Sequence, residues 1–178
     1  EVVMAEIKDT MQKIAGNRNP IEELLLKIPG FQGYLNKQYR RESDKMHRSY
    51  LAQKLDETKT HINDVKIELV DDGKIFSLDK IDNVLDKLDT IISRIKYADR
   101  GYSGFFDTNK IEDRELEMIH QLDLALVEQV TGIEVAIAKL SAEQDDSELK
   151  VALKEATKAI QALSDKFAER DNIVSGVA

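Results

Sequence analysis

The chain has 178 residues, of which 42% are apolar and 34% are charged, and this length and composition are typical of one folded domain with a sizeable core. With 34 acidic and 26 basic residues the net charge is −8, which excludes a general nucleic-acid binder because phosphate groups would be repelled. The chain has no cysteine, which excludes disulfides and thiolate chemistry, and it shows neither a membrane-spanning apolar run nor a signal-peptide pattern, so we expect a cytoplasmic protein.

Two short helices are predicted at the start of the chain. Apolar residues at three-to-four spacing predict the first over residues 4–14, and Gly16 ends it. Asn19 and Pro20 are typical of the start of a second helix, with asparagine as the cap and proline at the first helical position. Pro29-Gly30 ends that helix. The apolar residues are Met4, Ile7, Met11 and Ile14 in the first helix, and Ile21, Leu24, Leu25 and Ile28 in the second.

Four long helices are predicted in the rest of the chain. They run from about Tyr34 to Asp71, from a cap at Ser77 to about Tyr97, from about Ile111 to Ala142, and onward from a cap at Asp146 or Ser147. Each carries apolar residues at alternating four and three spacing, a pattern typical of a coiled-coil-like seam. The seam residues are Leu51, Leu55, Thr58, Ile62, Val65 and Leu69; Leu78, Ile81, Leu85, Leu88, Ile92 and Ile95; Leu116, Ile119, Leu126, Val130, Ile133, Ile137 and Leu140; and Leu149, Leu153, Ala156, Ile160, Leu163 and Phe167.

Helices joined by short connections usually pack as antiparallel neighbours. We therefore predict an all-α fold, in which four long helices form an antiparallel up-down bundle with coiled-coil-like seams. A single helical domain is expected over residues 1–178, with residues 1–33 as an N-terminal helical extension and residues 34–178 as the bundle core. The helix predicted over 34–71 would be about 55 Å long, so part of it must overhang, contact the N-terminal segments or meet another chain.

Two glycine-aromatic segments are the most distinctive feature of the sequence, namely Gly30-Phe31-Gln32-Gly33-Tyr34 and Gly101-Tyr102-Ser103-Gly104-Phe105-Phe106. In an antiparallel hairpin the start of one helix lies near the end of the next, so the topology predicts that both segments meet at one end of the bundle. Residues 27–48 also carry six basic residues against two acidic ones. This end is therefore predicted to be aromatic and basic on an otherwise acidic protein.

We interpret this end as a candidate binding surface for an acidic peptide, a phosphate-bearing ligand or anionic headgroups. The alternative is a structural lid, in which the glycines adopt positive φ and the aromatic side chains close the open end of the core. The two interpretations do not exclude each other. The candidate binding residues are Phe31, Tyr34, Arg40, Arg41, Arg100, Tyr102, Phe105 and Phe106.

His120 and Asp123 form a candidate polar pair in the core. Asp123 occupies a seam position where an apolar residue is expected, and the spacing allows a hydrogen bond between the two side chains within one helical turn. Such a pair is more typical of a polar layer that fixes helix register than of a catalytic proton-transfer group. Glu117 and His120 form an E-x-x-H motif, but a di-iron bundle needs a second copy, which the chain lacks. We predict no metal ligands, no cofactor and no catalytic residues.

One family resemblance accompanies these motifs. The segment Lys27-Ile-Pro-Gly-Phe-Gln-Gly-Tyr34 followed by Arg40-Arg41, with Lys96-Tyr-Ala-Asp-Arg-Gly-Tyr-Ser-Gly-Phe-Phe-Asp107, resembles stretches of a family of uncharacterised bacterial all-helical proteins of similar length. The resemblance covers these two segments. It implies a bacterial cytosolic protein, and it implies no activity.

Three classes of function follow from these features. The first is a non-enzymatic protein-interaction or scaffold module that binds a partner protein, with a second copy of this chain as one alternative. The second is a peripheral membrane protein that binds anionic lipid through the N-terminal helix and the basic end. The balanced charges of residues 4–14 and the absence of tryptophan disfavour it. The third is a small-molecule or metal-binding helical bundle.

Overall fold

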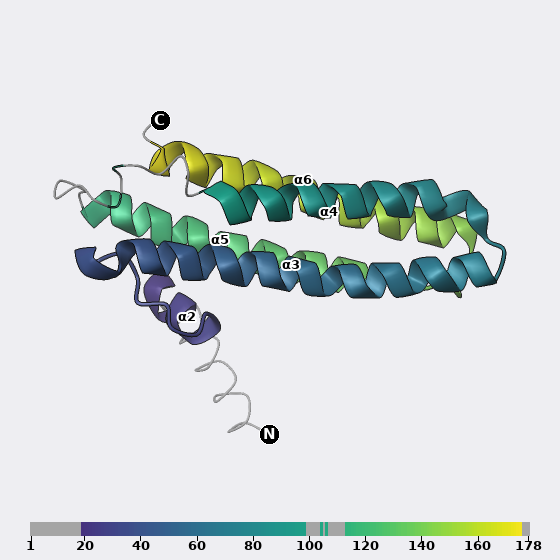
Figure 1. Cartoon of the computed structure of the whole chain (residues 1–178), viewed down its shortest axis with the longest axis horizontal. Helices are drawn as coiled ribbons and strands as arrows, with labels where there is room; N and C mark the ends of the chain where they lie inside the picture. Colours follow the sequence, from purple (N-terminus) through teal and green to yellow (C-terminus); the bar gives the residue numbers. More distant parts are fainter. Residues whose placement is uncertain (1–18, 99–103, 105, 107–112, 176–178) are drawn as a thin grey trace, which may run out of the picture.

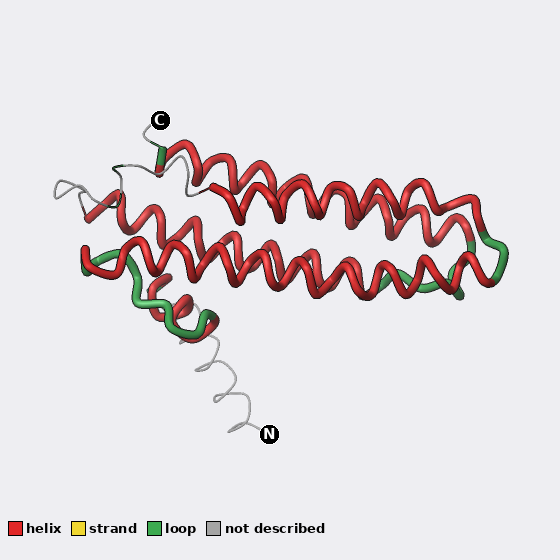
Figure 2. Tube along the Cα trace, viewed as in Figure 1, coloured by secondary structure: helices red, strands yellow, loops and turns green. Residues whose placement is uncertain are grey.

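The computed structural model describes residues 19–98, 104, 106 and 113–175, and within these residues the protein is all-helical without a strand (Figure 2). Two 3-10 helices, Lys37–Tyr39 and Ile75–Ser77, precede α3 and α4. The all-α prediction is confirmed, whereas the helix predicted over residues 4–14 lies outside the described residues. The α-helices are α2 (Pro20–Lys27), α3 (Arg40–Asp71), α4 (Leu78–Tyr97), α5 (Asp113–Ala138) and α6 (Asp146–Val174).

The four long helices lie side by side along the long axis of the molecule (Figure 1). The α3 helix packs along α4 and α5, and α6 packs along the same two helices. The short α2 packs against α5 near the end of the molecule at which α3 begins. We call this end the proximal end, and we call the opposite end, where α3 turns into α4, the distal end.

The predicted seams form the hydrophobic core. Every residue of the first, third and fourth predicted seams is buried, including Leu140 just after α5, whereas Leu78 and Leu85 of α4 are only partly buried. Val84 and Ile91 are buried in addition, because α4 packs against both α3 and α6 and therefore needs a wider apolar face than one seam. Each large apolar side chain buried in this way stabilises the fold by about 1.5–3 kcal/mol.

The helix ends follow from local capping chemistry. Asn19 caps α2 as predicted, since its Oδ1 accepts from the amide of Ile21 at 3.2 Å. The α3 helix ends at Asp71, also as predicted, and Gly73 terminates it. Gly73 has φ +70°, and the amides of Gly73 and Lys74 donate to the carbonyls of Val70 and Leu69 in a Schellman motif.

Three predicted helix ends are wrong. The α3 helix begins at Arg40 and not at Tyr34, because Asn36 accepts from the amide of Gln38 and starts a 3-10 turn ahead of it. The cap of α6 is Asp145, whose Oδ1 accepts from the amides of residues 147 and 148 in a capping box. The α5 helix ends at Ala138, and the chain then turns through residues 139–145.

Candidate functional site

The first glycine-aromatic segment meets Phe106 of the second at the proximal end, as the topology predicts. The ring of Tyr34 stacks on Phe106 with a centroid distance of 5.4 Å and on His120 at 4.9 Å. Phe31 meets the edges of Tyr34 at 5.7 Å and of His120 at 6.4 Å. All four rings are buried. These side chains, which we call the aromatic cluster, therefore close the end of the core as the lid interpretation expects.

Gly33 allows the loop to approach His120 closely. Its φ is +73°, and a Cβ at this position would lie 3.2 Å from His120 Nε2 and 3.5 Å from Ile21 Cγ2. Gly73 has a similar φ of +70° but nothing within 4 Å of its Cβ position. The two glycines thus share a backbone requirement, and only Gly33 also has a packing requirement.

Replacing Gly33 with alanine is expected to destabilise the fold more than replacing Gly73 with alanine. Both substitutions force a left-handed backbone on a residue with a Cβ, at a cost of about 1–2 kcal/mol. Gly33→Ala also displaces His120, which weakens the hydrogen bond from the Tyr34 amide to that ring. Urea denaturation of both variants measures the difference, and equal losses of stability would contradict the packing role of Gly33.

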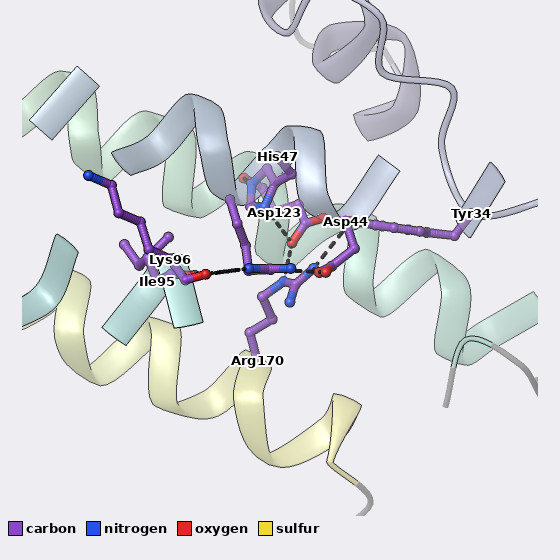
Figure 3. Close-up of polar contacts among 8 residues, drawn as sticks. Tyr34, Asp44, His47, Ile95, Lys96, Asp123 and Arg170 are labelled. Carbon is purple, nitrogen blue, oxygen red and sulfur yellow. Dashed lines mark hydrogen bonds and ion pairs between the residues drawn. The ribbon is translucent and has the colours of Figure 1, made fainter. Parts of the chain in front are cut away.

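A network of charged side chains, all buried, contacts Tyr34 of the aromatic cluster (Figure 3). At its centre Arg170 of α6 donates through Nε to Asp123 Oδ1, and through Nη2 to Asp44 Oδ1 at 2.8 Å. The same Nη2 lies 3.2 Å from the Tyr34 hydroxyl oxygen. One guanidinium therefore joins α3, α5, α6 and the loop before α3. We call the whole set the buried polar network; its members are Tyr34, Asp44, His47, Arg48, Asp123 and Arg170.

Arg48 extends the buried polar network to α4. Its Nε donates to Asp44 Oδ2 at 2.9 Å, and its Nη1 donates to the carbonyls of Ile95 and Lys96 at 3.2 and 3.1 Å. These carbonyls lie in the last turn of α4, the part of a helix whose carbonyls side chains commonly bind. The charges of Arg48 and Arg170 thus balance those of Asp44 and Asp123, and each of the four side chains is hydrogen-bonded.

Tyr34 is held through its backbone and its side chain together. Its amide donates to His120 Nε2 at 3.1 Å, its carbonyl accepts from Arg40 Nε at 2.6 Å, and its hydroxyl donates to Asp123 Oδ2. Burial, followed by the charge of Asp123, raises the pKa of the Tyr34 phenol well above its usual range. The phenol therefore stays protonated and remains a hydrogen-bond donor.

Burial also sets the charge state of the other members. It lowers the pKa of His47, although Asp123 opposes this effect, and it lowers the pKa of His120 in the same way. His47 Nε2 lies 3.0 Å from the Asp123 carbonyl oxygen, to which the neutral ring donates. For Asp123, burial disfavours the charge, but Arg170, His47 and the hydrogen bond from Tyr34 together hold its pKa below the usual range.

This arrangement has the residue types of an acid-base catalytic site, but its side chains are not accessible to a substrate. The acidic and basic groups face one another, and all of them are buried. Asp123 is held as a carboxylate by an arginine, and Tyr34 is held as a phenol, so neither is poised to exchange a proton near neutral pH. The arrangement therefore stabilises the proximal end and fixes the loop over residues 28–34.

The structure separates the predicted binding residues into three groups. Phe31, Tyr34 and Phe106 lie in the aromatic cluster and Arg40 is buried against Tyr34, so none of these four forms an exposed surface. Arg41 is exposed. Arg100, Tyr102 and Phe105 lie outside the described residues.

The predicted polar pair is brought together through a third residue. His120 and Asp123 are both buried, but they bind Tyr34 from two sides, His120 at the amide and Asp123 at the hydroxyl, and no direct hydrogen bond joins them. His120 Nε2 accepts from the Tyr34 amide instead, and the His120 ring stacks on the Tyr34 ring. Glu117 is exposed while His120 is buried, so the E-x-x-H motif does not form one site.

Sequence reasoning missed Asp44, Arg48 and Arg170. All three continue the seams, since residues 44 and 48 precede Leu51 at the seam spacing, and residue 170 follows Phe167 at the same spacing. They occupy core positions of the seams, as Asp123 does. This shared seam register is the sequence signal from which they could have been predicted. The four charges together form a polar layer near the proximal end.

An open groove lies on the surface outside the buried polar network. It has a volume of about 370 Å³ and lies between the end of α2 and the first turns of α3. Ile28 and Pro29 form one wall, Met46 and Tyr50 line the α3 side with partly buried side chains, and Lys45 is exposed at its rim. We call it the proximal groove; Glu42, Ser49 and Gln53 complete its lining.

Neither metal binding nor a membrane span is indicated by the described part of the chain. In that part, no three His, Asp or Glu side chains are grouped so that they could hold a metal ion. Within residues 19–98 and 113–175, every helix is too short or too polar to cross a lipid bilayer. Comparison with models of known protein families, with curated proteins and with solved structures finds no match to this chain.

Proposed function

We propose that the protein is a non-enzymatic interaction or scaffold module whose recognition surface is the proximal groove. The observation that carries this proposal is the anchoring of the loop that forms one wall of the groove. The aromatic cluster holds Phe31, and the hydrogen bonds to His120 and Asp123 hold Tyr34. A wall fixed in this way gives a preformed groove, so a partner binds without the cost of ordering the loop.

The chemistry of the groove indicates the kind of partner. Met46 and Tyr50, whose side chains are partly buried, offer an apolar floor for one or two anchoring side chains. Exposed Lys45 lies at the rim, and exposed Arg41 lies in the same part of α3. The charged residues of the groove lining are one lysine and one glutamate, Lys45 and Glu42, so the groove fits a protein segment that carries apolar anchors and charges of both signs.

The long helices support a scaffold role. We infer that α3, α4, α5 and α6 form an antiparallel up-down bundle, which is supported by the short connections after α3 and α5 and by the pairwise packing of neighbouring helices. The 32 residues of α3 span about 48 Å at 1.5 Å per residue. A bundle of this length keeps whatever binds at its two ends well apart.

Site-specific photocrosslinking tests the proposal. A photoreactive phenylalanine analogue at Ser49, in the proximal groove, is expected to crosslink the chain to one defined protein in the cells that naturally make it. The same analogue at Lys158, on the exposed face of α6, is the matched control and should not give that product. Adding Lys45→Glu should reduce the Ser49 product, because it reverses the charge at the rim. The same products from both positions, or none from Ser49, would contradict a recognition role for the groove.

A further inference from the structure

The described part of the chain leaves an apolar surface of α2 uncovered. Leu24 of α2 is buried, whereas Leu25 is 46% exposed and Leu26 is 71% exposed. Ile28 and Pro29, which follow α2 directly, form one wall of the proximal groove. Single exposed leucines are ordinary, but two adjacent ones beside a groove are typical of a surface that binds another apolar segment.

The sequence that directly precedes α2 has an apolar face of its own. Residues 1–18 lie outside the described residues, and a helix is predicted over residues 4–14 from apolar residues at three-to-four spacing. On such a helix Asp9 and Lys13 lie on the side opposite the apolar face. A helix of this kind is stabilised when its apolar face packs against another apolar surface. The apolar residues are Met4, Ile7, Met11 and Ile14.

The connection to α2 has a length typical of a helical hairpin. Residues 15–18 join the predicted helix to Asn19, the cap of α2, and antiparallel helices are commonly joined by about two to five residues. At about 1.5 Å per residue, a helix over residues 4–14 is about 17 Å long, whereas the eight residues of α2 span about 12 Å. When it is laid back along α2, the predicted helix therefore passes the exposed leucines and reaches the proximal groove.

We infer that residues 4–14 pack back along α2, cover its exposed leucines, and place Met4 and Ile7 over the floor of the proximal groove. This inference rests on the proposed function, because it names an occupant that competes with the partner at the proposed recognition surface. The charged lining of the groove is Lys45 and Glu42, and residues 4–14 carry two acidic and two basic side chains. Charge therefore does not oppose this contact.

The covalent connection selects this segment as the occupant. A segment joined to its binding surface by a short linker has an effective concentration of roughly millimolar at that surface. A partner protein must displace the segment, so the apparent affinity of the partner is reduced by the fraction of molecules in which the groove is open. Residues 4–14 thus regulate access to the proximal groove.

Photocrosslinking of the purified full chain tests this inference. A photoreactive phenylalanine analogue at Ser49, in the lining of the groove, should crosslink to residues 1–18 of the same chain, and mass spectrometry of the digested product identifies the crosslinked peptide. The same analogue at Lys158, on the exposed face of α6, should not give this product. A product that joins two copies, or the absence of a product with residues 1–18, would overturn the inference.

Two double variants distinguish the apolar face from the polar face. Ile7→Ser/Met11→Ser should abolish the internal crosslink, whereas Asp9→Ser/Lys13→Ser, which keeps the net charge, should retain it. The chain has no cysteine, so Ser49→Cys introduces one thiol in the groove. This thiol should react with a thiol reagent about ten-fold or more faster when Ile7→Ser/Met11→Ser is added, because the open fraction rises. Equal reaction rates with the two double variants would contradict the inference.

Crosslinking in cells keeps this inference separate from the proposed function. Removing the competing segment by Ile7→Ser/Met11→Ser should raise the yield of the product between Ser49 and the partner protein. If the purified chain gives no internal product while Ser49 crosslinks to one defined protein in cells, the internal contact is refuted and the proposed function stands. If the internal product forms but Ser49 crosslinks to no other protein, even with Ile7→Ser/Met11→Ser, the proposed function fails although the internal contact is present.

Discussion

Replacing Arg170 with alanine is expected to lower the free energy of unfolding by about 3–5 kcal/mol, the cost of breaking a buried ion pair by removing one partner. The variant leaves Asp44 and Asp123 buried without the guanidinium that lies between them. It also removes a contact to the Tyr34 hydroxyl, which loosens the loop over residues 28–34. Urea denaturation followed by circular dichroism measures the change.

Two further variants test whether the stability lost in Arg170→Ala is lost because a charged group is left buried without its partner. Lys166→Ala removes a half-exposed ion pair with Glu169 on the same helix, and it should cost less than about 1 kcal/mol. Adding Asp123→Asn to Arg170→Ala should recover part of the lost stability, because Asp123 is then the carboxylate without an arginine, whereas Asp44 keeps its ion pair with Arg48. A loss from Arg170→Ala as small as that from Lys166→Ala would show that the network contributes little.

Acidification is expected to destabilise the protein in two steps. Burial lowers the pKa values of His47 and His120, so the unfolded chain takes up protons below about pH 6.5 that the folded chain does not bind. Stability is therefore full above this pH and falls as the pH decreases, by at most about 1.4 kcal/mol per pH unit for each histidine. The lowered pKa of Asp123 adds a second loss below about pH 4.

The first step can be assigned by substitution. Glutamine at position 47 can donate to the Asp123 carbonyl, and glutamine at position 120 can accept from the Tyr34 amide, but neither titrates. The double variant His47→Gln/His120→Gln should therefore lose the pH dependence between 6.5 and 5 and keep the loss below pH 4. His61→Gln, on the exposed face of α3, controls for replacing a histidine by glutamine. Unfolding free energies measured across this pH range decide the question, and an unchanged slope in the double variant would exclude the buried histidines as its source.

Most of the fold could be predicted from local patterns. Seam spacing identified the four long helices and their core residues, because every third or fourth residue of an amphipathic helix returns to the same face. Caps were harder, since Asp145, Asp146 and Ser147 are all suitable cap residues, and only the capping box with Glu148 distinguishes Asp145. Tyr34 looked helical by its position, but its backbone groups bind His120 and Arg40 from other elements.

The sequence predicted where the candidate site lies, but it did not predict how the side chains of the site are arranged. Topology brought the glycine-aromatic segments together, and the stacking of Tyr34 on Phe106 confirms it. Counting charges along the sequence overstated the basic surface, because Arg40 and Arg48 turn inward. The pairing of Arg170 with Asp44 and Asp123 could not be predicted. It depends on which helices are neighbours and on which of their residues lie at the same level along the long axis of the molecule.

The separation of the network partners along the chain constrains the order in which the molecule folds. Arg170 lies 136 positions from Tyr34 and 126 from Asp44, so its contacts close loops that nearly span the protein. Loops of this length are costly to close before other structure exists, and hairpins such as α3–α4 and α5–α6 can form first. We therefore expect the polar layer to form after the transition state and mainly to slow unfolding. The unfolding arm of the chevron of Arg170→Ala will therefore shift more than its folding arm.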